Sequence, residues 1–268
     1  MTSNFAMIGI ACKMGDKPLY FDAVNECGLC AAGLNFPKNA VYHKPIGNKY
    51  NVASFELIPW LLGSCRSVKE AVEKLKNTNV TNYNFSESLP NTPLHWIVAD
   101  KDSAVAVEST REGLQIHEDP MGVLTNNPPF PYHVYHLTEY MQLTPHQPDN
   151  ALCPKVELDK YCGGLGGLGL PGDFSSSSRF VRAVFLKNHT ARETEKTAVI
   201  NRFFHIMDGV SVPKGCVKTD GGRDWQTVYT ACADRASFSY HFTTYQNRTI
   251  QSISGNLDAD EVRFINIY

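Results

Sequence analysis

Segments with strand periodicity occupy the beginning, the middle and the end of this 268-residue chain, and segments with helical periodicity separate them. Residues 5–12, FAMIGIAC, and 18–36, PLYFDAVNECGLCAAGLNF, are predicted to form strands, with turns or bulges at Gly28 and Gly33. A doubly wound fold would instead alternate strand and helix regularly. The grouped order predicts an α+β chain in which sheets and helices form separate layers.

Two helices are expected after the opening strands. Residues 53–65, ASFELIPWLLGSC, are apolar nearly all round, and residues 67–77, SVKEAVEKLKN, have one apolar face. Ser67 and Glu70 stand at the spacing of a capping box, in which each side chain bonds the other residue's backbone amide. The second segment is therefore predicted to be a helix that begins directly after Ser67.

The rest of the chain returns to strands, then helices, then strands. Residues 94–100 and 104–110 alternate across a short polar link and predict a hairpin. The further strands expected are residues 113–119, 122–128, 225–234, 237–245 and 249–255. Residues 178–189 and 195–210 have helical periodicity. No repeat or linker divides the chain, so residues 1–268 are expected to form a single domain.

Composition and charge narrow the class of protein. The formal net charge is −2, which gives no attraction to nucleic acid or to an acidic membrane surface. The longest apolar runs are too short to span a bilayer, and no secretion signal is recognisable at the start. Eight scattered cysteines without a repeated spacing are interpreted as reduced thiols. A soluble, cytoplasmic protein is expected.

The stretch YCGGLGGLGLPGDFSSSSRF, residues 161–180, contains the pattern G-x-G-x-x-G. A dinucleotide site needs a strand before the glycines and a helix that starts among them, whereas Pro171 stands where that helix would run. We interpret the stretch as a loop with unusual backbone angles, followed by a helix capped by one of the serines at 175–178. Arg179 then lies in the first turn of that helix.

Two short motifs are interpreted as structural. Cys27 and Cys30 form C-x-x-C, but no second pair completes a zinc site and no helix starts there, as a thioredoxin-like site requires. His133 and His136 form H-x-x-H without an acidic partner of metal type nearby. We therefore expect no metal and no organic cofactor.

Asn35 and Asn126 each stand at the predicted end of an apolar strand, close before a proline. Asparagine is common in turns for local reasons, so each residue alone is weak support for function. Amide groups held at strand ends are nevertheless suited to stabilising an oxyanion. Together with Arg179 they form a predicted group of two neutral donors and one fixed cation.

The sequence resembles a known family, the choloylglycine hydrolases. This family includes the conjugated bile acid hydrolases of the N-terminal-nucleophile superfamily. The sequence motifs that carry the resemblance are spread over almost the whole chain: AGLNFP, NVASFELIPWLLG, PLHWIVAD, VESTREGL, GVLTNNP, GGLGLPGDFSSSSRFVRA, FFHI and KGC. The resemblance implies an αββα sandwich of two antiparallel sheets between helix layers. It also implies a homo-oligomer, often a tetramer, and cleavage of the amide that joins a bile acid to glycine or taurine.

The resemblance assigns roles to individual residues. The backbone amide of Asn35 and the side chain of Asn126 match the oxyanion-hole positions, and Arg179 matches the arginine that supports the nucleophile and the developing charge. Asparagine rather than tyrosine at position 35 favours the bile-salt branch over the related penicillin V acylases. The positions that match the apolar sterol pocket are Met14, Phe21, Phe85 and Leu89.

The family's nucleophile is an N-terminal cysteine whose own α-amine acts as the base. Here the match begins at NFAMIGIA, residues 4–11, so the expectation is a chain that lacks this cysteine and the opening strands of the fold. Such a chain is expected to be inactive alone. Thr2 as a substitute nucleophile would stand at the head of the wrong strand. The alternatives left open are a catalytically inactive steroid-binding remnant and a penicillin V acylase-like amidase.

Overall fold

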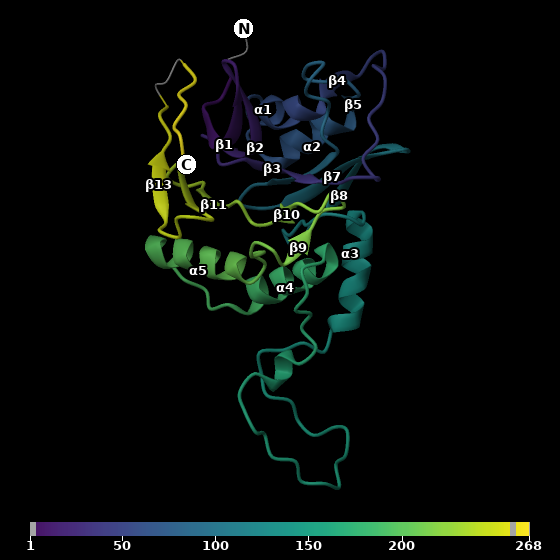
Figure 1. The fold of residues 1–268 in the computed structure, drawn as a ribbon, viewed down its shortest axis with the longest axis vertical. Helices are drawn as coiled ribbons and strands as arrows, with labels where there is room; N and C mark the ends of the chain where they lie inside the picture. Colours follow the sequence, from purple (N-terminus) through teal and green to yellow (C-terminus); the bar gives the residue numbers. More distant parts are fainter. Residues whose placement is uncertain (1–3, 258–260, 268) are drawn as a thin grey trace.

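The computed structural model of the chain describes residues 4–257 and 261–267. Figure 1 shows successive layers: short helices, a large sheet, a smaller sheet and, on the far side, longer helices. Every strand pairing in the two main sheets is antiparallel. The predicted αββα arrangement is therefore confirmed.

The large sheet has six strands within the described residues, in the order β1-β2-β3-β6-β7-β8. The backbone of Gly28 has φ +83° in the turn between the second and third strands, as expected. The prediction of a break at Gly33 is wrong, because Gly33 pairs regularly with Trp96 and lies against its ring. The strands are β1 (Met7–Met14), β2 (Lys17–Asn25), β3 (Cys30–Asn35), β6 (Leu94–Ala99), β7 (Ala104–Thr110) and β8 (Gly113–Glu118).

One face of the large sheet is covered by α1 (Leu57–Leu62), which follows the 3-10 turn η1 (Ser54–Glu56), and by α2 (Val68–Lys76). The side chain of Ser67 accepts from the backbone amide of Glu70, as predicted. The carboxylate of Glu70 accepts from the amide of Arg66 instead of Ser67, so the capping box is only half formed. A short parallel pair, β4 (Tyr50–Ala53) and β5 (Thr78–Thr81), flanks these helices.

The smaller sheet contains β11 (Tyr229–Asp234), β12 (Ser239–Thr244) and β13 (Gln251–Ser254), with β12 in the centre. Ile10 and Val24 of the large sheet form one hydrophobic cluster with Tyr240 and Phe242 of the smaller sheet. Because residues alternate in direction along a strand, the neighbours of Tyr240 and Phe242 point to the opposite face. A separate two-stranded ribbon is formed by β9 (Val217–Lys218) and β10 (Asp224–Trp225).

The second helix layer is built mainly from α4 (Ser176–His189) and α5 (Lys196–Asp208), with α3 (Phe130–His136) beside them (Figure 1). Ser175 caps α4 by accepting from the amide of Ser178, which confirms the predicted serine cap. Phe130 and Phe180 pack with Ala106 of the large sheet. None of the described helices has the length and hydrophobicity that crossing a membrane requires.

The glycine-rich stretch belongs to a projecting segment, residues 141–172, which we call the arm. Figure 1 shows that it extends far from the body of the molecule. Gly164 and Gly169 adopt positive φ angles of +82° and +95°, and a helix starts only at Ser176. The loop interpretation is therefore confirmed. The arm includes the short turn η3 (Leu165–Gly167) and begins just after the turn η2 (Leu137–Tyr140).

Residues 122–128, predicted to be a strand, form a loop between β8 and α3. An isolated segment of strand conformation needs a neighbouring strand to satisfy its backbone amides and carbonyls. In this loop the side chains of His95 and His133, from distant elements, bond the carbonyls of Thr125 and Asn126 instead. Asn126 therefore lies in a side-chain-anchored loop and not at the end of a strand.

Candidate active site

The side-chain amide of Asn126 lies between Asn35 and Arg179. Its Nδ2 donates to the backbone carbonyl of Asn35 over 2.8 Å, and its Oδ1 accepts from Nη2 of Arg179, also over 2.8 Å. The three residues predicted to act together are thus joined by direct hydrogen bonds. One amide hydrogen of Asn126 is used by the Asn35 carbonyl, and an asparagine amide carries two.

Asn35 is the last residue of β3, where the chain leaves the large sheet. The next residue, Phe36, is fully buried, and its ring stacks on His95 at a centroid distance of 4.3 Å. The Phe36 amide donates to the carbonyl of Pro93 over 2.8 Å. This anchor holds the backbone of Asn35 at an exposed edge while the following residue is locked in the core.

Arg179 lies in the first turn of α4, where its Nε donates to the carbonyl of Phe174 over 3.1 Å. Burial lowers the pKa of Arg179, and the nearby charge of Arg182 lowers it further. A guanidinium remains charged even so, because its ordinary pKa is far above neutrality. Arg179 therefore presents a fixed positive charge to the oxygen of Asn126.

His133 also holds Asn126, a role that the sequence analysis missed. Its Nε2 donates to the backbone carbonyl of Asn126 over 2.9 Å, and its ring stacks on Phe180 at 4.9 Å. Burial lowers the pKa of His133, which keeps the ring neutral. The H-x-x-H spacing drew attention to this residue, but its partner His136 faces Glu139 at 3.5 Å and contributes nothing to the site.

A buried pair, His95 and Glu108, supports the same loop from the large sheet. Nε2 of His95 lies 2.7 Å from the carbonyl of Thr125, and its Nδ1 lies 3.1 Å from Oε1 of Glu108. The same carboxylate oxygen accepts from the amide of Phe130 over 2.9 Å. The sequence signal is present in LHW and VES, where a polar residue interrupts an apolar strand, but these residues predict only strands and family motifs, with no role at the site.

Further bonds connect the loop to α4 and to the chain after Asn35. The hydroxyl of Thr125 donates to the carbonyl of Ser176 over 3.0 Å, and the hydroxyl of Ser176 donates back to the carbonyl of Asn127. The side chain of Asn127 donates to the carbonyl of Pro37 over 2.6 Å. The loop that carries Asn126 is thus held from the large sheet, from α3 and from α4.

Comparison with known proteins places the chain in a family. Residues 1–263 match the family described as linear amide C–N hydrolases, choloylglycine hydrolase family. The chain belongs to this family. The family assignment suggested by the sequence motifs is confirmed, and the chain is of a hydrolase class that acts on linear amide bonds.

Similar proteins carry related names. A bile salt hydrolase/transferase of Lactiplantibacillus plantarum is 47% identical over 97% of this chain and 81% of its own length. A conjugated bile acid hydrolase of Lactobacillus acidophilus is 40% identical over 90% of this chain and 77% of its own length. A crystal structure of a mutant conjugated bile acid hydrolase from Clostridium perfringens superposes with a TM-score of 0.92 and 34% identity, covering 100% of this chain and 83% of that one.

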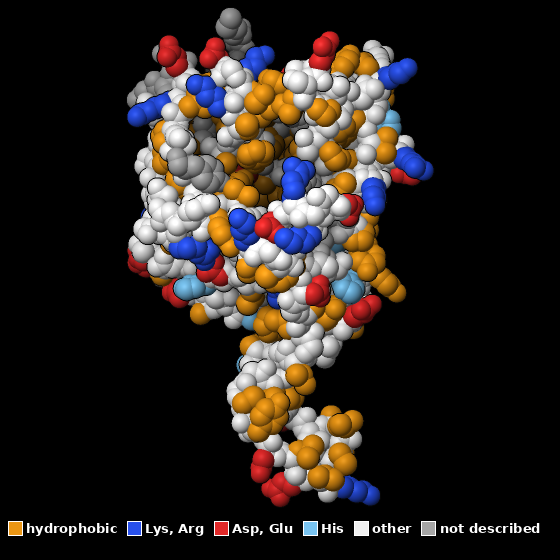
Figure 2. All heavy atoms as spheres, viewed as in Figure 1, with side chains coloured by type: hydrophobic (Ala, Val, Ile, Leu, Met, Phe, Trp, Pro, Cys, Tyr) orange, Lys and Arg blue, Asp and Glu red, His pale blue; other side chains and the backbone are white. Residues whose placement is uncertain are grey.

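The pocket residues predicted from the choloylglycine hydrolase resemblance lie in two separate parts of the chain, one in the strands of a hairpin and one in a loop. Met14 and Phe21 belong to the β1–β2 hairpin, where Phe21 is 49% exposed. Phe85 and Leu89 lie between β5 and β6, and Phe85 packs edge-on against Phe55 at 5.3 Å. Figure 2 shows a hollow lined by hydrophobic side chains over the part of the sheet labelled β2 and β3 in Figure 1.

The cysteines of this choloylglycine hydrolase family member are all free thiols. Cys30 lies in the same strand as Asn35, but burial raises its pKa to about 12. Its thiol hydrogen bonds to the carbonyl of Gly28 at 3.9 Å. A thiol with such a pKa is poorly ionised at neutral pH and is therefore a poor nucleophile. Thr2, the alternative considered from the sequence, lies outside the described residues.

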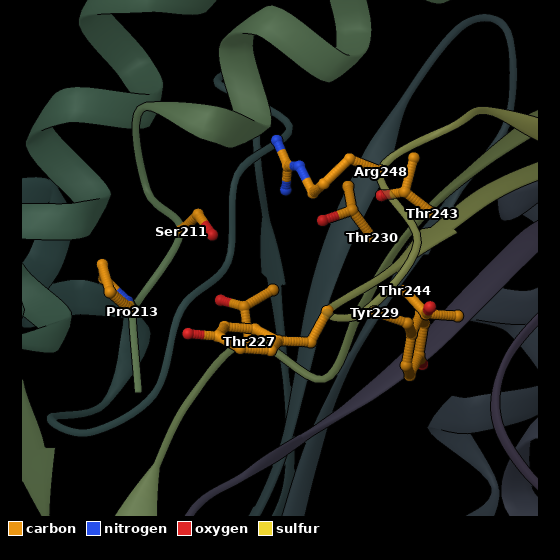
Figure 3. A pocket seen from close by; sticks show the side chains of 9 residues that line it. Ser211, Pro213, Thr227, Tyr229, Thr230, Thr243, Thr244 and Arg248 are labelled. Carbon is orange, nitrogen blue, oxygen red and sulfur yellow. The ribbon is translucent and has the colours of Figure 1, made fainter. Parts of the chain in front are cut away.

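A polar pocket of about 300 Å³ opens beside the smaller sheet (Figure 3). Its lining is rich in hydroxyl groups, and its arginine, Arg248, is paired with Asp208. Asn35, Asn126 and Arg179 are not among the residues that line this pocket, so it is not the predicted active site. The lining residues are Ser211, Pro213, Thr227, Tyr229, Thr230, Thr243, Thr244, Tyr245 and Arg248.

Proposed function

We propose that this chain contributes the oxyanion-binding part of an amidase that cleaves glycine- or taurine-conjugated bile acids. The observation that carries the proposal is the clamped amide of Asn126, bonded to Asn35 at one end and to Arg179 at the other. The names of the relatives in Lactiplantibacillus, Lactobacillus and Clostridium supply the substrate class. The sequence similarity of these relatives to this protein covers most of its chain.

The proposed reaction follows covalent amide hydrolysis. A thiolate attacks the amide carbon of the conjugate, and the carbonyl oxygen becomes an oxyanion. The second amide hydrogen of Asn126 and the backbone amide of Asn35 donate to this oxyanion, while Arg179 keeps the oxygen end of the Asn126 amide turned away from it. The C–N bond then breaks, glycine or taurine leaves with a proton, and water hydrolyses the thioester. No metal or organic cofactor enters these steps.

We propose that the thiol belongs to an N-terminal cysteine that is not among the eight cysteines of this sequence. The high pKa of Cys30, together with that of Cys232, which burial raises to about 11, supports this proposal. The mechanism also needs a free α-amine on the nucleophilic residue, which an internal cysteine lacks. This polypeptide alone is therefore proposed to be inactive.

The proposed sterol site lies toward the β1–β2 hairpin and the connection between β5 and β6. Met14, Phe21, Phe85 and Leu89 offer partly exposed apolar side chains, which suit a rigid hydrophobic ligand with a polar tail. The second candidate is a catalytically inactive bile-acid-binding protein that uses the same surface. A third, a penicillin V acylase-like amidase, has less support, because the solved penicillin V acylase is 22% identical and is evidence of the fold alone.

We further propose that the chain forms one unit over residues 1–268, assembles as a homo-oligomer, often a tetramer in this family, and works in the cytoplasm. The arm supports the assembly proposal. It leaves the body of the molecule (Figure 1) and exposes apolar side chains that a monomer would leave in water. The exposed fractions are 94% for Leu152, 82% for Tyr161 and 75% for Leu168.

The test compares this polypeptide with the same polypeptide preceded by the opening segment of the Lactiplantibacillus relative, here called the extended polypeptide. Release of glycine from glycocholate and of taurine from taurocholate is measured for both, together with ligand binding. We expect turnover by the extended polypeptide only. Turnover by the shorter chain would refute the proposal on the nucleophile. Binding by both without turnover by either would favour the inactive binding protein.

A further inference from the structure

A line of hydrogen bonds runs along the face of the smaller sheet that points away from the hydrophobic cluster. It begins at Asp234, the last residue of β11, and ends at Ser252 on β13. His241 on β12 is 6% exposed and lies in the middle of the line. Ser252 is directly opposite His241 in the strand register, and its side chain is exposed.

The chemistry of the end group determines the direction of these bonds. A carboxylate only accepts, so Ser237 donates to Oδ2 of Asp234 over 2.6 Å. The hydroxyl of Ser237 has then used its hydrogen, so the hydroxyl of Ser239 donates to Oγ of Ser237 over 2.7 Å. Oγ of Ser239 in turn accepts from Nε2 of His241 over 3.2 Å. Nδ1 of His241 is left as an acceptor. The hydroxyl of Ser252 donates to this nitrogen over 2.6 Å.

The charged groups near these hydrogen bonds keep Asp234 ionised and His241 neutral. Lys196 forms an ion pair with Asp234 at 2.9 Å and donates to Ser237 over 2.8 Å. Burial alone would raise the pKa of Asp234, but hydrogen bonds from Ser237 and Lys196 lower it to about 2. Burial lowers the pKa of His241, and the charge of Lys196 lowers it further. His241 is therefore neutral at pH 7, with Nδ1 available to take a proton.

A serine opposite a histidine on neighbouring strands is by itself an ordinary cross-strand contact. Two features distinguish this pair. The bonds through Ser239 and Ser237 to Asp234 fix the tautomer of His241, which is the function of the third member in catalytic triads. Ser252 also stands on β13, an edge strand of the smaller sheet as far as the structure describes it, so reagents can reach it.

We propose that Ser252 is an activated nucleophile, with His241 as its general base, and that it is acylated by small activated carboxylic esters. In this step Oγ of Ser252 forms a bond to the acyl carbon and its proton moves to Nδ1 of His241. The bond from the acyl carbon to the ester oxygen breaks, and that oxygen departs with the electron pair as an alkoxide or phenolate, which leaves as the anion or takes the proton from His241. The site does not depend on the proposed bile acid chemistry.

The probe for this site is p-nitrophenyl acetate, applied to the full chain at neutral pH. Exposed cysteines also react with such esters, so the readout is the mass of the peptide that contains Ser252, not the total nitrophenolate released. We expect one acetyl group on Ser252 in the unchanged chain and none in Ser252→Ala. In His241→Gln the rate of acetylation should fall by about 100-fold or more, the usual range for loss of a general base.

Ser254→Ala is the matched control, because Ser254 is exposed on the same strand and on the same face. It should leave the acetylation of Ser252 unchanged. Equal labelling of Ser252 and Ser254 would overturn the proposal, as would an unchanged rate in a folded His241→Gln variant. If His241→Gln fails to unfold cooperatively in urea, Ser239→Ala decides instead. That smaller change should slow acetylation of Ser252, and an unchanged rate would again overturn the proposal.

Discussion

Nη2 of Arg179 donates to Oδ1 of Asn126 over 2.8 Å, and this bond determines which end of the Asn126 amide faces Asn35. A guanidinium only donates hydrogen bonds, so the oxygen of the amide must turn toward Arg179. The nitrogen then faces the carbonyl of Asn35, 2.8 Å away. The relationship orients a donor toward the place where the proposed reaction develops negative charge.

Asn126→Ala removes this donor. In the extended polypeptide we expect kcat for glycocholate hydrolysis to fall by about 100- to 1,000-fold, as for loss of one oxyanion donor elsewhere. KM should change little, because the donor acts on the charge formed in the transition state. Asn201→Ala, on an exposed position of α5, is the control. A loss expressed only in KM would contradict the assigned role of Asn126.

His133 should make stability depend on pH. Its pKa in the folded protein is lowered below the ordinary value of 6.5, chiefly by burial, so the unfolded chain binds more protons in acid. The stabilisation is complete above about pH 6.5 and is lost as the pH falls through the folded pKa. Urea unfolding between pH 5 and 8 should therefore show a weaker acid loss in His133→Gln than in the exposed-site control His205→Gln. Equal slopes in the two variants would refute this assignment.

Glu108→Ala should destabilise the fold strongly. It removes the acceptor for both His95 and the amide of Phe130 in a place where His95 and Glu108 are almost fully buried. Breaking such a buried pair costs about 3–5 kcal/mol. The measurement is the free energy of unfolding in urea, with Glu118→Ala at an exposed position as the control. Similar values for the two variants would show that the buried pair does not hold the loop.

The arm should control assembly. Leu152→Asp combined with Tyr161→Asp places charges on side chains that are 94% and 82% exposed in the single chain. Burial of these charges between subunits would be unfavourable, so light scattering should report a smaller assembly than for the unchanged chain. Glu157→Asp, also in the arm, keeps the charge and should leave the assembly unchanged. An unaltered mass in the double variant would exclude the arm from the interface.

The thiol of Cys30 should react slowly with alkylating reagents. Its pKa of about 12, raised by burial, leaves little thiolate at neutral pH. With N-ethylmaleimide under native conditions, the exposed thiols Cys153 and Cys162 should be modified well before Cys30. Peptide mass mapping over time measures the order. Modification of Cys30 first would make it a candidate nucleophile and would contradict the proposal that the reactive thiol lies outside these eight cysteines.

Local patterns in the sequence were sufficient for most elements. Alternation of apolar residues identified the hairpin of β6 and β7, and serine caps at Ser67 and Ser175 identified the starts of α2 and α4. These features depend on neighbours a few residues apart, which a sequence contains directly. The family motifs likewise indicate Asn35, Asn126 and Arg179 from the sequence alone.

Only the tertiary structure decided how these residues are held. Residues 122–128 have the pattern of a strand, yet the carbonyls of Thr125 and Asn126 accept from His95 and His133, so no neighbouring strand is needed. The bonds that clamp Asn126 join residues 91 and 53 positions apart. The sequence alone determined which segments become strands and helices, because periodicity and capping are local. The packing of α3 and α4 against the large sheet decided the site, because that packing brings the distant partners within hydrogen-bond distance.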